Sequence, residues 1–286
     1  MAVAVVTDTT HYLPADVVAE RDLRLVSLYV RFGDTLERES EMPDFDAFYD
    51  RLRSAKDLPT TSQPSVGDFL AVYEPLVEAG HDVVSIHLSA AISGTYDSAL
   101  QARSQLEERG HTGRIAVVDS RTACGGMGLV ALGAAAAARD GGGVEEVVAR
   151  ANETLDALKI WFAVDTLEFL RRGGRIGAAQ AWIGGALKIK PILTLEEEIT
   201  PIERVRTSGK AFERMVEYMR SRADDGADGW VVQHIQAEDV ARRLVEQGRE
   251  IYGSEPVFVS ECGPVIGAHA GPGLVGVGGV PRALVA

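Results

Sequence analysis

The chain has 286 residues, of which 46% are hydrophobic and 25% are charged, as in ordinary soluble globular proteins. This composition excludes wholesale disorder and collagen-like repeats, and the length suits about two domains. The 29 Lys and Arg residues against 42 Asp and Glu give a net charge of −13, which argues against a nucleic acid partner because the chain as a whole would repel a polyanion.

The first half of the chain predicts βαβ units around a mostly parallel sheet, because short β-branched runs alternate with helical patterns. We expect strands at residues 3–7, 25–30, 83–88 and 115–119. We expect helices near residues 44–53, 66–79 and 96–109. Open α/β sheets bind ligands beyond the carboxyl ends of their strands, so the loops after these strands are the first place to look for a site.

A run of three glycines at 141–143 precedes a predicted helix from 144 to about 158, and we place the domain boundary there, giving domains 1–145 and 146–286. The second domain is expected to contain strands near 160–164, 188–194, 199–206, 230–234, 257–261 and 274–280, with helices near 208–220 and 238–252. A hairpin turn at 196–198 predicts that part of this second sheet is antiparallel.

The two cysteines, Cys124 and Cys262, are not part of any CxxC or Cys/His cluster, which argues against zinc, iron–sulfur or dithiol chemistry and favours a reducing cytoplasm. The start of the chain lacks a cationic segment and reaches Asp8 early, so it predicts a strand and not a signal peptide. The longest gently apolar stretch, residues 128–138, is too short to span a bilayer. We therefore expect a soluble, cytoplasmic protein with no integral membrane segment.

A cluster of hydroxyl residues precedes the helix predicted at 66–79. Ser65 suits the N-cap position and Asp68 the matching capping-box position. Capping does not account for Thr60, Thr61, Ser62 and Gln63, which add neutral hydrogen-bonding groups at the positive end of a helix dipole. The segment is therefore either a plain loop or an anion or carboxylate site.

A second candidate loop, SAAISGTY at 89–96, follows the strand predicted at 83–88 and leads into a helix. A strand, a loop of small residues and a helix start can present backbone N–H groups to an anion. Ser93 before Gly94 resembles half of a nucleophile elbow, although no GxSxG is present. We expect the hydroxyls of this loop and of Thr61 to converge on one ligand.

The glycine-rich segment near the end of the chain contains a GxGxxG pattern at Gly271, Gly273 and Gly276. Only ten residues follow it, too few for a βαβ unit, so it does not predict a dinucleotide site. His269 lies between small residues that leave room for a ligand, and it is the histidine most suited to a functional role. No metal-binding spacing or P-loop is present, and no cofactor or metal is predicted.

Residues 171–210 form a basic segment in an acidic chain. Eight cations against four acids give this segment a charge of +4, while the remainder carries −17; the cations are Arg171, Arg172, Arg175, Lys188, Lys190, Arg204, Arg206 and Lys210. Solvated helix and strand faces account for many such runs, but this one could also dock an acidic partner or a phosphate.

Taken together, these segments resemble the DegV proteins, the fatty-acid-binding subunits of bacterial fatty acid kinase. The resemblance runs over nearly the whole chain, in family order: VAVVTDTT, TTSQPS, ISGTY, LRRGGRIG with AAQAWIGGALKIKPIL, VRT and GPVIGAHAGPG. One departure is at Ala90 and Ala91, in a stretch that is often Ser-rich in the family.

The resemblance implies a three-layer α/β/α domain with a mostly parallel sheet, and a smaller two-layer α/β domain with a mixed sheet. It implies one long-chain fatty acid between them, with the carboxylate near Thr61, Ser62, Ser93, Gly94 and His269. A separate kinase subunit that carries ATP and magnesium would phosphorylate the carboxylate to an acyl phosphate, so this chain would itself not be an enzyme. The arginines at 171, 172, 175, 204 and 206 would dock that subunit.

Two other functions remain open at the level of the sequence. One is a serine-dependent lipid hydrolase or acyltransferase with Ser93 as nucleophile, His269 as base and Asp119 as a candidate orienting acid. The other is a lipid sensor that has no kinase partner.

Overall fold

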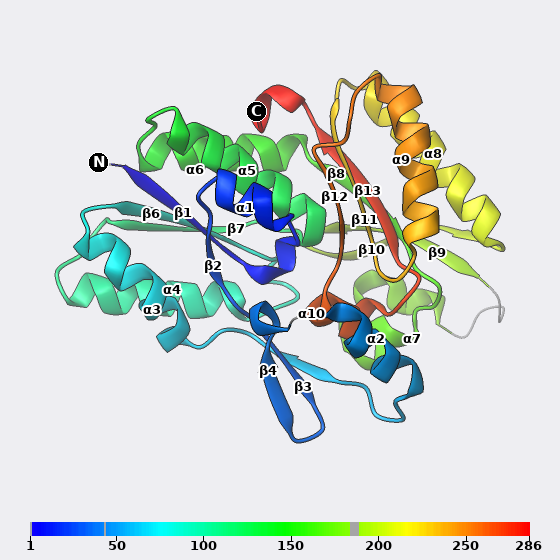
Figure 1. The fold of residues 1–286 in the computed structure, drawn as a ribbon, viewed down its shortest axis with the longest axis horizontal. Helices are drawn as coiled ribbons and strands as arrows, with labels where there is room; N and C mark the ends of the chain where they lie inside the picture. The colour runs from blue at the N-terminus through cyan, green and yellow to red at the C-terminus, as the bar shows by residue number, and fades with distance from the viewer. Residues whose placement is uncertain (1, 43, 184–188) are drawn as a thin grey trace.

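The computed structural model describes residues 2–42, 44–183 and 189–286. Its first sheet consists of parallel strands in the order β2-β1-β6-β7 (Figure 1). These strands are β1 (Val3–Asp8), β2 (Arg24–Val26), β6 (Asp82–His87) and β7 (Ile115–Asp119). The parallel sheet predicted for the first half of the chain is confirmed.

Helices cover both faces of the first sheet, which gives the predicted three layers. On one face lie α3 (Val66–Glu78) and α4 (Thr95–Glu108). On the other lie α5 (Cys124–Arg139) and α6 (Val144–Ala157). The capping box predicted for α3 is present, since Ser65 Oγ accepts from Asp68 N–H and the Asp68 carboxylate accepts from Ser65 N–H.

A second sheet of mixed direction has the order β10-β9-β8-β13-β11-β12. Its strands are β8 (Lys159–Ala163), β9 (Lys190–Glu196), β10 (Glu198–Val205), β11 (Gly229–His234), β12 (Phe258–Glu261) and β13 (Val275–Val280). Among the strand pairs described for this sheet, β11–β12 is parallel and the others are antiparallel. The predicted hairpin is confirmed, with Glu197 at φ +70° between β9 and β10; Lys188, at the start of the strand predicted there, lies outside the described residues.

Two helices, α8 (Ser208–Asp224) and α9 (Glu238–Tyr252), cover the outer face of the second sheet (Figure 1). Its inner face meets α5, which also packs against the first sheet. Nine of the thirteen buried residues of α5 are Gly or Ala, which lets both sheets approach the helix closely. The chain thus folds as two sheets that share one helix, and the division between residues 145 and 146 stays a prediction.

A small antiparallel sheet was not expected from the sequence. It has the order β4-β3-β5 and contains β3 (Tyr29–Phe32), β4 (Thr35–Arg38) and β5 (Thr60–Ser62). The single strand predicted at 25–30 is wrong: the chain leaves the first sheet after Val26 and starts β3 at Tyr29. Between β2 and β3, the Ser27 hydroxyl donates to Leu28 C=O and accepts from Ser40 N–H.

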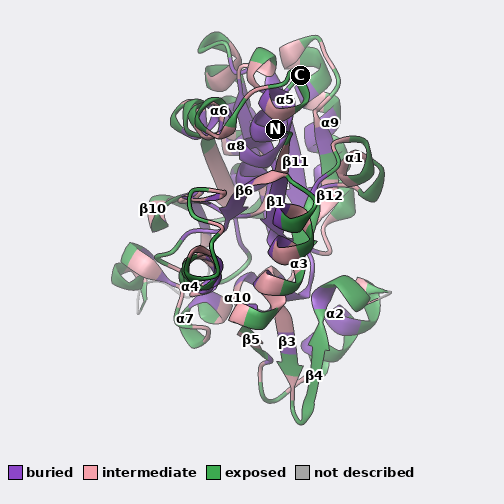
Figure 2. Cartoon of the chain, turned by 90° about the vertical axis from the view of Figure 1, so that its left-hand side faces the viewer, coloured by how far each residue is buried: buried purple, intermediate pink, exposed green. Residues whose placement is uncertain are grey.

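Short helices complete the fold; three of them lie near the small sheet, whereas the first, which follows β1, lies away from it (Figures 1 and 2). They are α1 (Ala15–Glu20), α2 (Phe45–Ser54), α7 (Glu168–Arg172) and α10 (Pro264–Ala270), with 3-10 turns at Thr9–His11, Glu39–Glu41, Gly177–Trp182 and Arg282–Leu284. The glycine-rich segment that contains His269 is therefore a helix, begun by Pro264. Within the described residues, no helix combines the length and the apolar character needed to cross a membrane.

Candidate ligand-binding site

An apolar cavity of about 130 Å³ lies between the first and second sheets. A site for one water needs only about 10–15 Å³ on a comparable measure, so the cavity has room for a row of atoms. One wall is formed by segments that follow β6 and β7, and the other by the inner faces of β8, β11 and β13. The apolar lining includes Leu28, Leu88, Ile92, Phe162, Leu195, Ile199 and Leu274. This is the strand-end position that the α/β pattern predicts.

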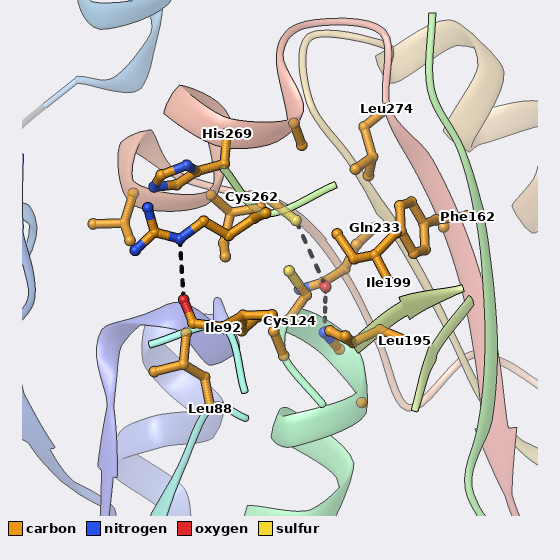
Figure 3. A pocket seen from close by; sticks show the side chains of 18 of the residues that line it. Leu88, Ile92, Cys124, Phe162, Leu195, Ile199, Gln233, Cys262, His269 and Leu274 are labelled. Carbon is orange, nitrogen blue, oxygen red and sulfur yellow. Dashed lines mark hydrogen bonds between the residues drawn. The ribbon is translucent and has the colours of Figure 1, made fainter. Parts of the chain in front are cut away.

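Polar side chains gather at one end of the cavity. Figure 3 shows His269 at this end, with Phe162 and Leu274 at the other. The polar lining here comes from four separate segments and comprises Thr61, Ser62, Gln63, Ser93, Arg175 and His269. The structure therefore brings together the two hydroxyl loops and the histidine that the sequence singled out.

Thr61 is held by the small sheet and not by a flexible loop. It pairs with Val30 in the β3–β5 register, and its Oγ1 lies 2.7 Å from His269 Nε2. Because side chains alternate along a strand, Ser62 turns away from Thr61; it is exposed and its hydroxyl donates to Gln63 C=O at 3.2 Å. Of the two adjacent hydroxyl residues, Thr61 is the one fixed in the polar end of the cavity.

The imidazole of His269 is neutral at physiological pH, because burial and then the nearby charge of Arg175 lower its pKa to about 4. Its Nδ1 is buried and has no hydrogen-bond partner among the described residues. We assign the ring proton to Nε2, where the Thr61 hydroxyl accepts it, because a buried N–H without an acceptor is costly. Thr61 then keeps its own hydroxyl hydrogen to donate to a ligand.

Ser93 lies on the cavity wall just before α4. Its Oγ is 2.9 Å from Thr95 Oγ1 and accepts from Thr95 N–H at 3.3 Å. Gly94, the N-cap residue of α4, provides space: a Cβ there would lie 3.0 Å from Gln63 Nε2. Gly94 thus lets the TTSQPS segment and the Ser93 loop approach each other.

A buried carboxylate that the sequence did not reveal supports α10. Glu39 accepts from Tyr12 O–H and Val265 N–H at 2.8 Å each, and from Thr9 O–H at 2.6 Å. Burial raises its pKa to about 7. Because Val265 is in the first turn of α10, Glu39 fixes the start of the helix that carries His269. Its position in a charged run gave no sign of this burial.

The middle of the cavity contains polar groups that the sequence also missed. Gln233, on β11, is only 4% exposed; its Oε1 accepts from Gly125 N–H, and its Nε2 donates to His11 C=O and Ser260 Oγ at 3.1 and 2.9 Å. Cys124 and Cys262 line the same region. The two cysteines are far apart in the sequence, and the fold brings their sulfur atoms close together (Figure 3). The only sequence signal was one amide in an otherwise apolar strand.

The five arginines grouped as a docking surface lie in different surroundings. Arg175 lines the cavity, donating to Ile92 C=O at 3.1 Å and to Gly173 C=O at 2.8 Å. Arg171 is paired with Glu168, and exposed Arg172 reaches the backbone of Lys56. Exposed Arg204 lies over the ring of Trp182, 5.2 Å from its centroid, and Arg206 is exposed. Their docking role stays a prediction.

The structure does not assemble the residues of the serine-enzyme alternative. Ser93 is bonded to Thr95 and His269 to Thr61, while Asp119 Oδ1 accepts from two backbone N–H groups, those of Ala90 and Arg121.

A serine, a histidine and an aspartate do meet elsewhere, in a series from Ser85 through His87 to Asp8. All three are 0% exposed, and Tyr73 donates to the Ser85 hydroxyl at 2.7 Å. This series is a buried hydrogen-bond network, and its serine has no access to a substrate.

Two sheets around a shared helix, with an apolar cavity between them that carries hydroxyl and imidazole groups at one end, define a class of α/β protein with a candidate ligand site between its sheets. A family model described as "Uncharacterised protein, DegV family" matches residues 2–282. The chain belongs to the DegV family.

Relatives and solved structures match along the whole chain. A DegV domain-containing protein of Streptomyces coelicolor is 41% identical over 278 residues, covering 96% of this chain and 97% of the relative. A structure from Thermus thermophilus, described as fatty acid binding of a DegV family protein, is 35% identical with a TM-score of 0.87. The match covers 98% of this chain and 99% of the Thermus chain. The structure of DegV from Bacillus subtilis, described as a fatty acid binding protein, is 36% identical with a TM-score of 0.86. The match covers 97% of this chain and 98% of the Bacillus chain.

Proposed function

We propose that this protein binds one long-chain fatty acid in the cavity and presents its carboxylate to a separate ATP-dependent kinase subunit. The observation that carries the lipid part is an apolar cavity with hydroxyl groups at one end, those of Thr61 and Ser93 among them. The family's solved structures from Thermus thermophilus and Bacillus subtilis, described as fatty-acid-binding, support the same ligand class.

The acyl chain supplies most of the binding energy in this proposal. Each buried methylene contributes about 0.8 kcal/mol, so ~14 methylenes give a gross gain of about 11 kcal/mol before association and ordering costs. The carboxylate then needs only modest hydrogen bonds to orient it. The Thr61 hydroxyl accepts from His269 Nε2–H and keeps its own hydrogen, so it is suited to donate one of these hydrogen bonds.

A carboxylate held by neutral hydroxyls remains available for phosphoryl transfer, because no bidentate arginine pair neutralises it. Among the described residues, the arginine that lines the cavity is Arg175, and it donates to two backbone carbonyl groups. The positive charge of Arg175 stabilises a nearby anion without a bidentate hydrogen bond between the guanidinium and that anion. The kinase subunit would bring ATP and magnesium and form the acyl phosphate, and the exposed cations Arg172, Arg204 and Arg206 are suited to dock it.

The test of lipid binding is extraction of the denatured recombinant protein followed by mass spectrometry. We expect a stoichiometric fatty acid in the wild type and much less in the double variant Thr61→Ala/Ser93→Ala. The matched control, Thr60→Ala/Ser104→Ala, removes two exposed hydroxyls and should retain the lipid. A wild-type protein that is empty and takes up no added fatty acid would overturn the proposal.

A second arm addresses the kinase partner and the enzyme alternative. Incubation of the loaded protein with a fatty acid kinase ATP-binding subunit and ATP should yield an acyl phosphate. If no acyl phosphate forms while the lipid stays bound, the result would favour the lipid-sensor alternative. A fluorophosphonate should not label Ser93, because His269 is bonded to Thr61 and not to the serine; labelling would favour the hydrolase.

A further inference from the structure

Two thiols meet inside the cavity, although they come from distant parts of the chain. Cys124 is the first residue of α5, and Cys262 lies between β12 and α10; both line the cavity and both are free. Figure 3 shows their sulfur atoms close together, midway between the polar end marked by His269 and the apolar end marked by Phe162.

A shared acceptor holds the pair in place. The Cys262 thiol lies 3.7 Å from Gln233 Oε1, and the same oxygen accepts from Gly125 N–H, next to Cys124. A hydrogen bond with Cys124, and then burial, raise the pKa of the Cys262 thiol well above its usual range. The two cysteines are therefore direct neighbours on one part of the cavity wall.

The two thiols differ in reactivity for structural reasons. Cys262 is 0% exposed, and its raised pKa keeps it in the thiol form. Cys124 is partly exposed at the cavity wall, where a small oxidant can reach its sulfur. Cys124 is thus suited to attack an oxidant, and Cys262 to resolve the product.

We propose that Cys124 and Cys262 are a redox-modifiable pair, oxidised by hydrogen peroxide to a disulfide when the cavity is empty and shielded when an acyl chain fills it. The Cys124 sulfur attacks one peroxide oxygen and gives up its thiol proton, the O–O bond breaks, and a sulfenic acid and one water form. The Cys262 sulfur then attacks the sulfenic sulfur, the S–O bond breaks, and a second water leaves. Two thiols lose two protons and two electrons, and the peroxide is reduced to two waters.

The shielding rests on the proposed lipid-binding function, whereas disulfide formation in the empty protein does not. An acyl chain along the cavity covers both sulfur atoms, because they line its middle. Oxidation then proceeds only through the empty fraction of the protein. At a free fatty acid concentration ten times Kd, the rate should fall about tenfold.

The experiment uses the full-length protein, delipidated or loaded with oleic acid, exposed to hydrogen peroxide and then unfolded in N-ethylmaleimide. Intact mass spectrometry distinguishes a disulfide, which takes up no reagent, from two alkylated thiols. We expect a disulfide in the empty protein and about tenfold slower oxidation in the loaded one. In the Cys262→Ala variant, dimedone should trap a sulfenic acid on Cys124. Cys124→Ala should leave Cys262 largely unmodified, and thermal melting confirms that both variants fold.

The outcomes separate this inference from the proposed function, because lipid occupancy is measured in the same samples. If both thiols stay free after peroxide treatment of the empty protein, the proposed redox pair would be overturned. Equal oxidation of empty and fully occupied protein would overturn the shielding. A protein that takes up no oleic acid would overturn the proposed function and the shielding with it, while the disulfide in the empty protein would still establish the pair.

Discussion

The Nε2 of His269 lies 2.7 Å from the Oγ1 of Thr61, joining the short helix α10 to the edge strand β5 at the polar end of the cavity. Each residue is fixed by its own support. Strand pairing with Val30 sets Thr61, and the buried carboxylate of Glu39 sets the start of α10. The polar end of the site is therefore an assembled contact between elements, and it can be tested one support at a time.

Thr61→Val keeps the shape of the side chain and removes its hydroxyl. We expect fatty acid affinity to fall about five- to thirtyfold, because a hydrogen bond to the carboxylate is lost. Ser62→Ala is the matched control and should change affinity little, since the Ser62 hydroxyl bonds to the backbone of Gln63. Titration with a fluorescent fatty acid measures both; a larger loss with Ser62→Ala would reverse the assignment.

His269→Gln should reduce the loss of stability on acidification. The pKa of His269 in the folded protein is about 4, below the ordinary value of 6.5. The contribution of this neutral imidazole to the free energy of unfolding is therefore fully present above about pH 6.5 and is lost as pH falls towards 4. Glutamine cannot take up that proton. Relative to the wild type, the variant should gain about 1–3 kcal/mol between pH 7 and pH 4. Urea unfolding across this range measures it, and a pH-independent difference would contradict the buried neutral imidazole.

Glu39→Gln should have the opposite pH dependence. The folded-state pKa of Glu39 is about 7, above the ordinary value of 4.5, so the folded protein retains this proton longer than the unfolded chain. The carboxyl group thus lowers the free energy of unfolding as pH rises from about 4.5 to 7. The free energy of unfolding of the variant, relative to that of the wild type, should therefore be higher at pH 8 than at pH 5. Chemical denaturation at these two pH values decides; an equal difference at both would exclude a titrating Glu39.

Arg204→Ala or Arg206→Glu should weaken partner-dependent phosphorylation and leave lipid binding intact. Both arginines are exposed and neither lines the cavity. Arg220→Ala, at an exposed position on α8, is the control for removing one positive charge. The measurements are acyl phosphate yield at several ionic strengths and lipid occupancy. An equal loss of both activities would reject a docking role.

Gly276→Leu should shorten the preferred acyl chain. Gly276 pairs with Phe162 across β13 and β8, and both line the cavity. A Cβ at Gly276 meets Phe162 Cβ at 3.4 Å, an ordinary contact, so the added isobutyl group can be accommodated only by taking cavity space. Mass spectrometry of the bound lipids should show a shift to shorter chains. Gly209→Ala, on the exposed first turn of α8, is the control, and an unchanged distribution with full occupancy would contradict the proposed path.

Local patterns were sufficient to predict most of the fold. Alternating strands and helices predicted the parallel sheet, and Glu196–Glu198 the hairpin of the mixed sheet. The small sheet was missed because β5 is only three residues long and polar, so its pairing with β3 depends on tertiary contacts. No helix was predicted around His269, because the start of this helix is held by Glu39, far away in the sequence.

The site was predictable where chemistry and local pattern coincided, as at Thr61, Ser93 and His269. It was not predictable for Arg175, because a basic side chain that turns towards backbone carbonyls has the same sequence signature as one in solvent. The contact between Cys124 and Cys262 was equally hidden. Spacing along the chain carries no information on two residues that only the packing of α5 against the second sheet brings together.

The composition of α5 has a mechanical consequence. Because Gly and Ala dominate its buried surface, the two sheets meet this helix with few large side chains that interlock. A smooth contact of this kind favours shear, in which packed layers slide slightly without losing contact. The first turn of α5 borders the cavity, and the second sheet forms its opposite wall. A small slide would change the width of the cavity, so the space between the two sheets can adjust to ligands of different thickness.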